Sequence, residues 1–502
     1  MLRLLGSNKT LCDGFSRRDL LQVGGLGMLG LGLSDALTLA AEQPRGNGRS
    51  ASFGKAKACI LLFPFGSPPQ HETFDPKPLA PAEVQGEMKA IGTSVAGVEI
   101  CEGLPRVAQV MDKITVVRSM THPYPVHGVA YALSGMPTYT PAIEANPRAP
   151  EHWPFIGSVV DYIEHQRTGG RLPAMPRNIG LPWQFGSKSS LPTLAGPYAA
   201  FLGQAFDPVW TDFNGRGTKV VPKLTDGQTE DVYDPFAGVP AEGSFLLPAS
   251  GELPPGLSLE QVGMRQALLA QFDQASAWLD SDRRVQTFDQ YRQLAWSLIL
   301  SGKVREALDV HRETPAMRER YGMTLFGQAS LAARRLVEAG GKFVSVFWDP
   351  FEPFGGSCWD THANHFPRLK EYLLPVFDQA YSALIDDLDQ RGLLDETLVV
   401  CISEHGRTPQ IDSKPKGAGR HHWSRVYSAA FAGGGVARGR VVGASDAHGG
   451  DVQHTPVSPK DVLASVLYLL GIDPSTTVAG PLGRPALVAG DGHVRPELFA
   501  AS

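Results

Sequence analysis

Residues 57–63, Lys-Ala-Cys-Ile-Leu-Leu-Phe, form an apolar run that leads into a loop rich in proline and glycine, residues 64–75. A short, unbroken apolar run of this kind is typical of a strand buried on both faces of a parallel sheet. Further strand-like runs follow at residues 113–118, 342–348, 397–402 and 426–432. Helical segments separate several of these runs, so the sequence predicts an α/β fold with a central, mostly parallel sheet.

Helical patterns occur at residues 102–111, 309–340, 366–392 and 458–470. In the third of these segments, leucine and phenylalanine recur on one face, and Gly392 stands where a helix C-cap is expected. The last segment begins with Ser458 as a predicted N-cap, followed by a proline in the first turn. We expect these helices to flank the sheet.

The domain organisation is less clear from length alone, because 502 residues fit about three domains of about 150 residues or one large α/β domain. From about residue 141 to 255 the chain is rich in proline, glycine and aromatic residues, with few periodic runs. We interpret this stretch as an insertion that carries part of a binding surface. Residues from about 257 to 340 return to helical composition and lead back to the sheet.

Composition excludes several classes of protein. A hydrophobic content of 42% is ample for a core, which excludes a disordered or fibrous chain. A net charge of −5 does not fit a general nucleic-acid binder. Five cysteines in 502 residues are too few for a disulfide scaffold, and the absence of a CxxC spacing excludes a zinc ribbon and a thioredoxin-type motif. Eight of the 14 histidines follow residue 360, and this skew suggests a site.

The N-terminus resembles an export signal. Ser16-Arg-Arg-Asp-Leu-Leu21 precedes a mildly apolar run rich in glycine and leucine, which closes at Ala40 and Ala41. Paired arginines before such a run predict a twin-arginine signal over residues 1–41. The protein is therefore expected in the periplasm or outside the cell, with no membrane span in the mature chain. The alternative is that the run is retained as a membrane anchor.

Histidine and carboxylate side chains collect after the predicted strands. Because ligands bind beyond the carboxyl ends of strands in open α/β sheets, these loops are expected to converge. Imidazole and carboxylate ligands together suit zinc, manganese or iron. The loops are Gln70–Asp75, Thr121–His127, Trp359–His365 and Glu404–His405, followed shortly by His421 and His422.

Each motif also has an ordinary explanation. Asp360 and His362, two residues apart, lie on one face of an extended loop, but such a triplet also arises by chance. Glu404 and His405 are adjacent at a strand end and can serve two neighbouring metals, with a glycine next to them that permits a sharp turn. Arg407 either holds an anionic oxygen or forms a salt bridge with a neighbouring carboxylate.

Six motifs in order resemble a known family: Phe74-Asp-Pro-Lys-Pro78, Val117-Arg-Ser-Met-Thr-His122, Trp359-Asp-Thr-His362, Glu404-His-Gly-Arg-Thr-Pro409, Gly419-Arg-His-His-Trp423 and Val457-Ser-Pro-Lys-Asp461. They resemble the exported bacterial family catalogued as domain of unknown function 1501, itself similar to sulfatases and alkaline phosphatases. The resemblance implies one alkaline-phosphatase-like domain over residues 42–502, an α/β sandwich with Pro/Gly-rich insertions.

The resemblance also implies a divalent metal site, with zinc as first choice and manganese, iron or calcium as alternatives. The implied ligands are Glu72, Asp360, His362, Glu404, His405 and His422. Two departures concern the loop after the first strand, where Pro69 stands for the family's serine and Glu72 for its aspartate. The extra methylene of Glu72 displaces its oxygens unless the backbone compensates.

The nucleophile is the weakest part of the resemblance. No Cys-x-Pro-x-Arg motif is present, so formylglycine chemistry is excluded. Thr121 offers a hydroxyl, and His127 is a candidate ligand, general acid or phosphoryl acceptor. A metal-activated water would make a side-chain nucleophile unnecessary.

These observations predict an exported metal-dependent hydrolase of phosphate or sulfate esters, on a small-molecule or carbohydrate substrate, with Arg407 holding an anionic oxygen. The alternative is a non-catalytic binding or scaffold protein that has lost its nucleophile. A mutase or transferase of the same superfamily is a third interpretation.

Overall fold

The computed structural model describes residues 50–124, 127–136, 144–147, 149, 151–171, 173–189, 195–223, 230–247, 302–352, 358–413 and 417–500. The predicted export signal, residues 1–41, and residues 257–301 of the predicted helical segment lie outside the described residues. Within the described part of the chain, no helix is both long and apolar enough to cross a membrane.

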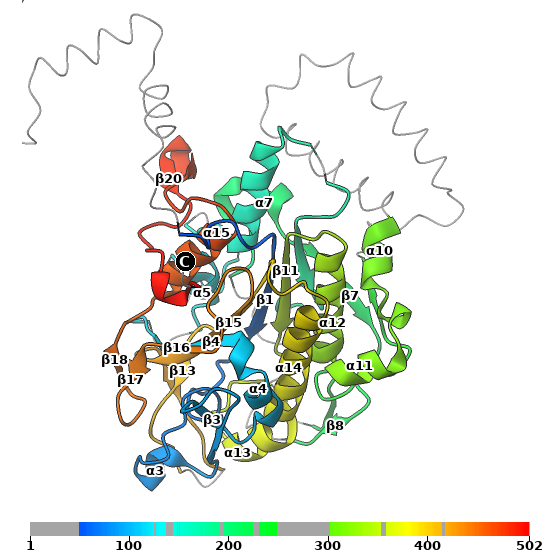
Figure 1. Cartoon of the computed structure of the whole chain (residues 1–502). Coiled ribbons are helices and arrows are strands. Elements are labelled where there is room, and N and C mark those ends of the chain that lie inside the picture. The colour runs from blue at the N-terminus through cyan, green and yellow to red at the C-terminus, as the bar shows by residue number, and fades with distance from the viewer. Residues whose placement is uncertain are drawn as a thin grey trace, which may run out of the picture. The chain divides into compact units, whose positions relative to one another are not determined.

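An eight-stranded sheet forms the centre of the fold, in the order β16-β4-β15-β12-β1-β11-β5-β6 (Figure 1). Its strands are Ala58–Pro64 (β1), Ile114–Met120 (β4), Asn178–Leu181 (β5), Val209–Trp210 (β6), Phe343–Trp348 (β11), Thr397–Cys401 (β12), Tyr427–Ala432 (β15) and Arg440–Val442 (β16). Only β15 runs antiparallel to its neighbours, β12 and β4. The predicted mostly parallel sheet is therefore confirmed.

Strand β1 lies inside the sheet, and both of its faces and both of its edges are covered. All seven of its residues are buried, and it pairs in parallel with β11 on one side and β12 on the other. This double burial explains its unbroken apolar sequence. Because the three strands are parallel, the loops that follow them leave from the same edge of the sheet.

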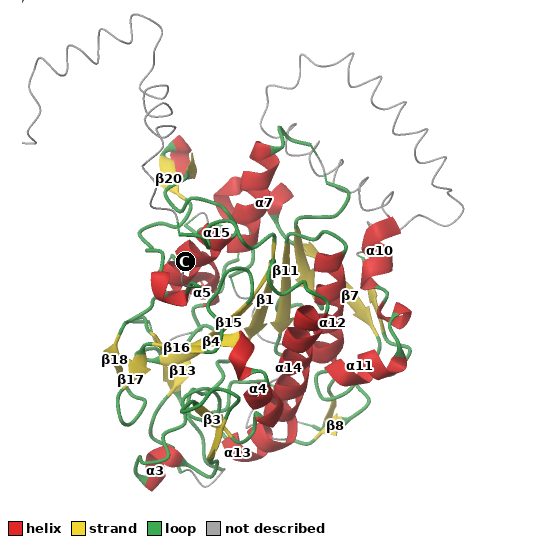
Figure 2. Ribbon diagram, viewed as in Figure 1, coloured by secondary structure: helices red, strands yellow, loops and turns green. Residues whose placement is uncertain are grey.

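Helices cover both faces of the sheet (Figure 2). The α-helices of the described residues are Ala82–Gln85 (α3), Pro105–Gln109 (α4), Val129–Ser134 (α5), Ile156–Arg167 (α7), Gly302–Leu308 (α10), Pro315–Tyr321 (α11), Leu325–Glu338 (α12), His365–Arg368 (α13), Leu374–Gln390 (α14) and Pro459–Leu469 (α15). Ile60 and Leu62 of β1 share one core with α4, α12 and α14. Leu61 and Phe63 share a second core with α5, α7 and α15. The alternation along β1 thus separates the two layers.

The predicted helices are present with two adjustments. The helix expected over 102–111 is confined to α4, and the one expected over 366–392 contains a π-helical turn, Leu369–Leu373, between α13 and α14. Gly392 follows α14 with φ 69°, the left-handed conformation of a C-cap glycine. Ser458 caps α15, as the sequence predicts, and the structure adds a capping box with Asp461.

The proline-rich stretch 141–255 contributes to the main sheet. Its described residues form α7 and the strands β5 and β6, of which β5 pairs with β11. These described residues are therefore part of the central fold. That the stretch also carries part of a binding surface stays a prediction.

Short two-stranded ladders complete the structure. They are Ala90–Gly92 (β2) with Glu99–Cys101 (β3), Asp212–Asn214 (β7) with Ser244–Leu246 (β10), Val220–Val221 (β8) with Val232–Tyr233 (β9), Gly406–Arg407 (β13) with His422–Trp423 (β14), Ala444–Ser445 (β17) with Val452–His454 (β18), and Thr477–Ala479 (β19) with Pro485–Leu487 (β20).

Candidate functional site

The loops after β1, β11 and β12 converge on one another. Gly66, two residues after β1, donates its backbone N–H to Glu404 Oε1 at 2.9 Å. A Cβ at Gly66 would lie 2.4 Å from the backbone nitrogen of Asp360, so only glycine permits this approach. The β13–β14 ladder pairs Arg407 with His422 and brings that histidine to the same edge of the sheet.

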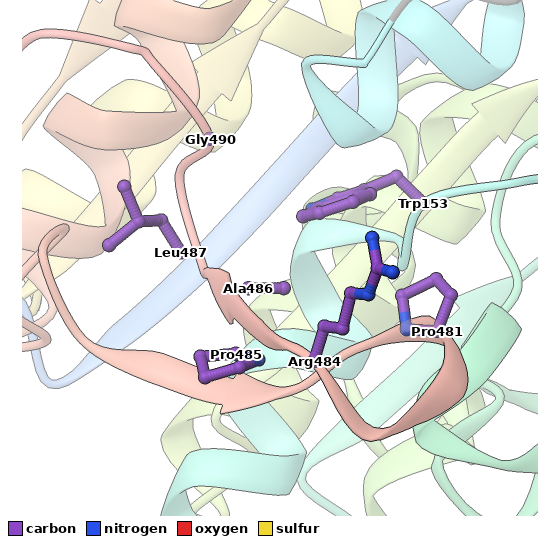
Figure 3. Close-up of a pocket in the computed structure, with 7 residues that line it drawn as sticks. All are labelled: Trp153, Pro481, Arg484, Pro485, Ala486, Leu487 and Gly490. Carbon is purple, nitrogen blue, oxygen red and sulfur yellow. The ribbon is translucent and has the colours of Figure 1, made fainter. Parts of the chain in front are cut away.

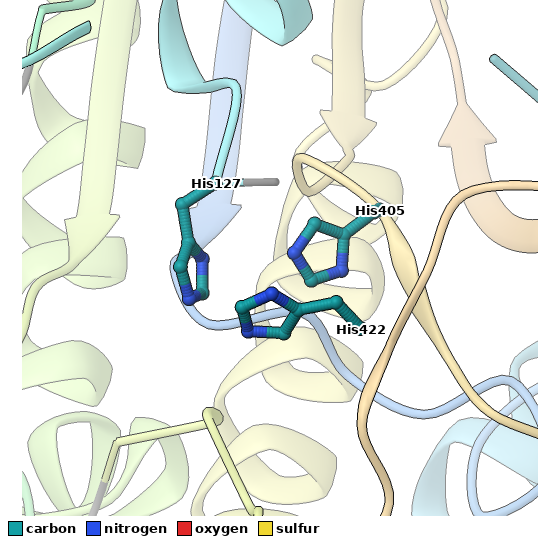
Figure 4. Close-up of side chains that lie close together, drawn as sticks. All are labelled: His127, His405 and His422. Carbon is teal, nitrogen blue, oxygen red and sulfur yellow. The ribbon is translucent and has the colours of Figure 1, made fainter. Parts of the chain in front are cut away.

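Three histidines from three segments form the first group of possible metal ligands. One ring nitrogen from each of His127, His405 and His422 lies within 4.8 Å of the others. Their ring centroids are 4.2–5.1 Å apart, and the rings gather around one point (Figure 4).

A second group of ligands shares His422 with the first. It consists of Asp360, His362 and His422, whose ligand atoms also lie within 4.8 Å of one another. His362 Nε2 is 3.0 Å from His422 Nε2 and 3.0 Å from Asp360 Oδ1. His422 Nε2 is 3.3 Å from the same carboxylate oxygen. We call Asp360, His362, His405 and His422 the open cluster.

His405 carries a buried nitrogen that fits a metal. Its Nδ1 donates to the carbonyl oxygen of Gly406 at 2.8 Å, which leaves the lone pair on Nε2. This Nε2 is buried and has no hydrogen-bond partner among the described residues. Burial and the nearby charges of His127 and Arg407 keep the pKa of His405 well below its usual range. A neutral imidazole with an unused lone pair is a ligand in the form that zinc, manganese or iron requires.

His127 is held between two carboxylates. Its Nδ1 donates to Glu404 Oε1 at 2.8 Å, and its Nε2 lies 3.4 Å from Asp360 Oδ2. Burial disfavours the charged ring, but the hydrogen bonds with Asp360 and Glu404 outweigh it and raise the pKa of His127 to about 9. In the structure without metal, this imidazole therefore holds a proton near neutral pH.

Glu404 was expected to bind metal, but donors surround its carboxylate. Oε1 accepts from Gly66 and His127, and Oε2 accepts from Ser403 Oγ at 2.6 Å. Its side chain is fully buried. Glu404 is thus brought to the open cluster through His127, and it is not part of either ligand group.

Arg407 was expected to hold an anionic oxygen of a substrate. The structure places its fully buried guanidinium in an ion pair with Asp360. Burial works against the charge of Asp360, but Arg407 outweighs it and holds the pKa of this carboxyl well below its usual range. Arg407 also donates to the carbonyl oxygens of Gly66, Ser67 and Arg420, so its N–H groups are engaged within the protein.

Glu72 is not brought into either ligand group. Arg420 donates to both oxygens of its carboxylate at 2.6–3.2 Å, and His365 Nε2 lies 3.1 Å from Oε2. Burial disfavours the carboxylate, but Arg420 outweighs it and lowers the pKa of Glu72 far below its usual range. We call Glu72, Arg420 and His365 the closed network.

Thr121 also lies outside the ligand groups. Together with His122, Tyr131, Arg425, His454 and Lys460 it lines a pocket of about 880 Å³. His122 links this pocket to the site, because its Nε2 donates to the backbone oxygen of Glu404 at 2.7 Å.

A second pocket, of about 500 Å³, contains none of the predicted site residues. Trp153 and Arg484 line it together with residues of the β19–β20 hairpin (Figure 3).

Several residues that hold the site were not predicted from the sequence. Arg420 and His365 lie beside predicted ligands in the chain, and that proximity was the available signal. Ser67 adopts φ 69°, and its buried hydroxyl has no hydrogen-bond partner in the described part of the chain. The residues around Ser67 in the sequence do not predict its positive φ.

Comparisons with known proteins give three findings. No curated protein matches the sequence of this chain. Among solved structures, a sulfatase from Pseudoalteromonas sp. is similar at 12% identity and a TM-score of 0.36, covering 92% of this chain and 78% of that chain. A phosphonate monoester hydrolase from Silicibacter pomeroyi is similar at 11% identity and a TM-score of 0.33, covering 89% of this chain and 78% of that chain. At TM-scores this low, neither likeness says anything about the chemistry of this chain.

The third finding identifies the family. A family model described as "Protein of unknown function (DUF1501)" matches residues 56–499, which is most of the chain. The chain therefore belongs to the DUF1501 family.

Proposed function

We propose that this protein is a metal-dependent hydrolase of phosphate or sulfate esters. The observation that carries the proposal is the open cluster, which contains four of the five residues in the two ligand groups that share His422. The buried Nε2 of its His405 has no partner among the described residues. A buried imidazole nitrogen without a hydrogen-bond partner calls for an explanation, and a bound cation supplies one here.

Asp360, His362, His405 and His422 would hold the metal, with zinc as first choice and manganese, iron or calcium as alternatives. When bound, a divalent ion supplies Lewis acidity toward an ester oxygen and toward water. Arg407 and the Gly406 carbonyl orient Asp360 and His405, respectively, through the contacts described above.

His127 would act as the proton donor in this proposal. It holds a proton between Glu404 and Asp360, and a general acid must carry a proton at working pH. Glu404 would orient the ring and Asp360 would stabilise its charge. Thr121 would contribute to substrate binding from the wall of the 880 Å³ pocket. A small-molecule or carbohydrate ester as substrate, and export by residues 1–41, belong to the same proposal.

The rival function is a metal-binding protein without catalysis. It is favoured by Arg407, whose guanidinium is fully buried and engaged within the protein, and by Thr121, whose place is in the wall of the 880 Å³ pocket. Neither of these two residues is therefore arranged to act on a substrate at the open cluster.

Metal analysis tests the proposal. Protein purified without chelators is expected to contain stoichiometric zinc, manganese, iron or calcium, and the Asp360→Ala, His405→Ala double variant is expected to lack it. Absence of metal from the parent protein would contradict the proposal of a metal-dependent hydrolase. If metal is present, the parent is expected to hydrolyse aryl phosphate or aryl sulfate esters. Turnover of neither ester would favour the binding protein.

A further inference from the structure

The two arms of the β13–β14 hairpin continue beyond the ladder through residues 408–413 and 417–421, and they align Asp412 with His421. Beyond the β13–β14 ladder, Thr408 donates its backbone N–H to the carbonyl of His421 at 2.9 Å. Asp412 and Gly419 then exchange two backbone hydrogen bonds, at 2.8 and 3.0 Å. The hairpin thus continues on both sides of His421.

This hairpin is seated directly on the loop that carries His362. The backbone N–H of His365 donates to Ala418 at 2.9 Å, and that of Arg420 donates to Thr361 at 3.2 Å. A Cβ at Gly419 would lie 1.9 Å from the carbonyl oxygen of His362, so the two backbones touch where only glycine fits. The backbone therefore fixes the position of His421 relative to His362.

The side chains form a line of hydrogen bonds that ends at the open cluster. Asp412 Oδ2 lies 2.9 Å from His421 Nε2. His421 Nδ1 lies 2.9 Å from His362 Nδ1. The opposite nitrogen of His362, Nε2, is the atom that lies 3.0 Å from Asp360 and from His422.

The direction of each hydrogen bond in this series follows from Asp412, which stands at its start. A carboxylate only accepts hydrogen bonds, so neutral His421 carries its hydrogen on Nε2 and presents a lone pair at Nδ1. Asp360 competes for the hydrogen of His362 at Nε2, but Asp360 is already paired with Arg407 and His127, so His362 donates from its own Nδ1. Its Nε2 is left with a lone pair, directed at the place where Asp360 and His422 also present ligand atoms.

We propose that Asp412 and His421 are positioning residues that fix the tautomer of His362, so that its Nε2 is ready to bind the metal. The inference rests on the proposed metal site. The Gly406 carbonyl has the same effect on His405. His405 and His362 thus adopt the same tautomer, His405 through a backbone carbonyl and His362 through the side chains of His421 and Asp412. Hydrogen-bonding partners of metal-bound histidines typically have this effect.

The first test observes the tautomer without metal. Protein with ¹⁵N-labelled histidine is examined in chelator by long-range ¹H–¹⁵N NMR at about pH 8. His362→Gln assigns the signal. The parent is expected to carry hydrogen on Nδ1 of His362. In His421→Leu the hydrogen is expected to move to Nε2, where Asp360 accepts it. In His421→Gln, whose amide oxygen can still accept, it is expected to stay on Nδ1.

A matched control is available elsewhere on the chain. His311 pairs with Asp309 at 3.2 Å with a similar exposed fraction, 38% against 42% for His421. His311→Leu is expected to leave the His362 signal unchanged. Hydrogen on Nε2 in the parent, or on Nδ1 in His421→Leu, would overturn the proposal.

The second test measures zinc affinity by competition with a chromophoric chelator. His421→Leu is expected to bind zinc about 10- to 100-fold more weakly than the parent. His421→Gln should recover most of the loss, and His311→Leu should bind like the parent. Equal loss in the Leu and Gln variants would contradict tautomer control. If the parent binds neither zinc nor manganese, iron or calcium, the proposed function fails, whereas the tautomer result stands or falls on its own.

Discussion

Glu72 and Asp360 are carboxylates with low exposure, each paired with a fully buried arginine, yet their surroundings differ. In the closed network, Arg420 contacts both oxygens of Glu72 and donates its remaining N–H groups to carbonyl oxygens of Thr408, Pro409 and Val84. In the open cluster, a single oxygen of Asp360, Oδ1, contacts Arg407 and the ring nitrogens of His362 and His422.

The difference indicates which group is complete without a ligand. The charges of the closed network are balanced within the protein, as expected of a pair that holds loops together. In the open cluster, the buried Nε2 of His405 has neither a hydrogen-bond nor an ion-pair partner among the described residues, whereas His365 Nε2 of the closed network lies 3.1 Å from Glu72. We therefore expect substitutions in the closed network to affect stability, and substitutions in the open cluster to affect metal binding.

The largest effect is expected for Glu72→Gln, which leaves the buried charge of Arg420 without its partner. Breaking a buried pair from one side costs about 3–5 kcal/mol, so urea unfolding in chelator should show a loss of that order. Glu83→Gln, the same change at an exposed position, should be nearly neutral. A variant that keeps its metal-free stability but loses zinc would make Glu72 a ligand and would erase the distinction between the two regions.

The next effect concerns His422, the ligand shared by both groups. In chelator, His422→Asn should change the free energy of unfolding by less than about 1 kcal/mol, because no buried charge pair is broken. With zinc at 100 times Kd, the parent should gain about 2.7 kcal/mol and the variant should gain almost nothing. Thermal unfolding with and without zinc measures this. An equal zinc-induced gain in both proteins would remove His422 from the site.

A smaller effect on the free energy of unfolding is expected when the pH is lowered. Burial and the nearby charge of Arg420 lower the pKa of His71 to about 4. Since the unfolded value is about 6.5, the unfolded state binds more protons between these values. The contribution of His71 is therefore complete above about pH 6.5 and is lost as the pH falls toward 4.

His71→Gln keeps a donor for the carbonyl of His448, which His71 Nε2 contacts at 2.8 Å, and removes the titrating group. Between about pH 6.5 and 4.5, urea unfolding in chelator should show the parent losing at least about 1 kcal/mol more than the variant. Parallel pH profiles for the two proteins would mean that the pKa of His71 is not lowered in the folded protein.

The smallest effect is expected at Ser67, whose carbonyl accepts from Arg407 beside the open cluster. Its φ of 69° is strained for serine, so Ser67→Gly should stabilise the protein by about 1 kcal/mol. Ser67→Ala keeps the strain and serves as the control for the hydroxyl. Zinc affinity should be unchanged in both variants. A weaker affinity in Ser67→Ala would add this hydroxyl to the open cluster.

Much of the fold could be predicted because its signals are local. The apolar sequence of β1 and the cap of α15 identify those elements without knowledge of their neighbours. Strand β5 could not be predicted, since it is only four residues long and contains Gly180. A Cβ there would lie 2.4 Å from the ring of Trp210, so its glycine reflects a contact between strands rather than a local preference. The direction of β15 likewise depends on how the chain returns to the sheet.

The site was predictable in its ligand types but only partly in its partners. Asp360, His362, His405 and His422 follow strands and match motif positions, and the structure brings them together. Glu72 was assigned to the metal because it stands where the family has an aspartate. Its partner Arg420 is 348 residues away in the chain, and no spacing rule reveals an ion pair of that separation.

The central position of β1 also has a consequence for synthesis in the cell. Strand β1 is the first strand of the sheet to leave the ribosome, but its neighbours β11 and β12 belong to the last third of the chain. At about 5–20 residues per second, the roughly 280 residues between β1 and β11 take on the order of 15–60 s to translate. Throughout that interval an entirely apolar strand lacks both of its partners. Nascent chains halted before residue 343 should therefore depend on chaperones to avoid aggregation, while the ligand loops can assemble only after nearly the whole chain is made.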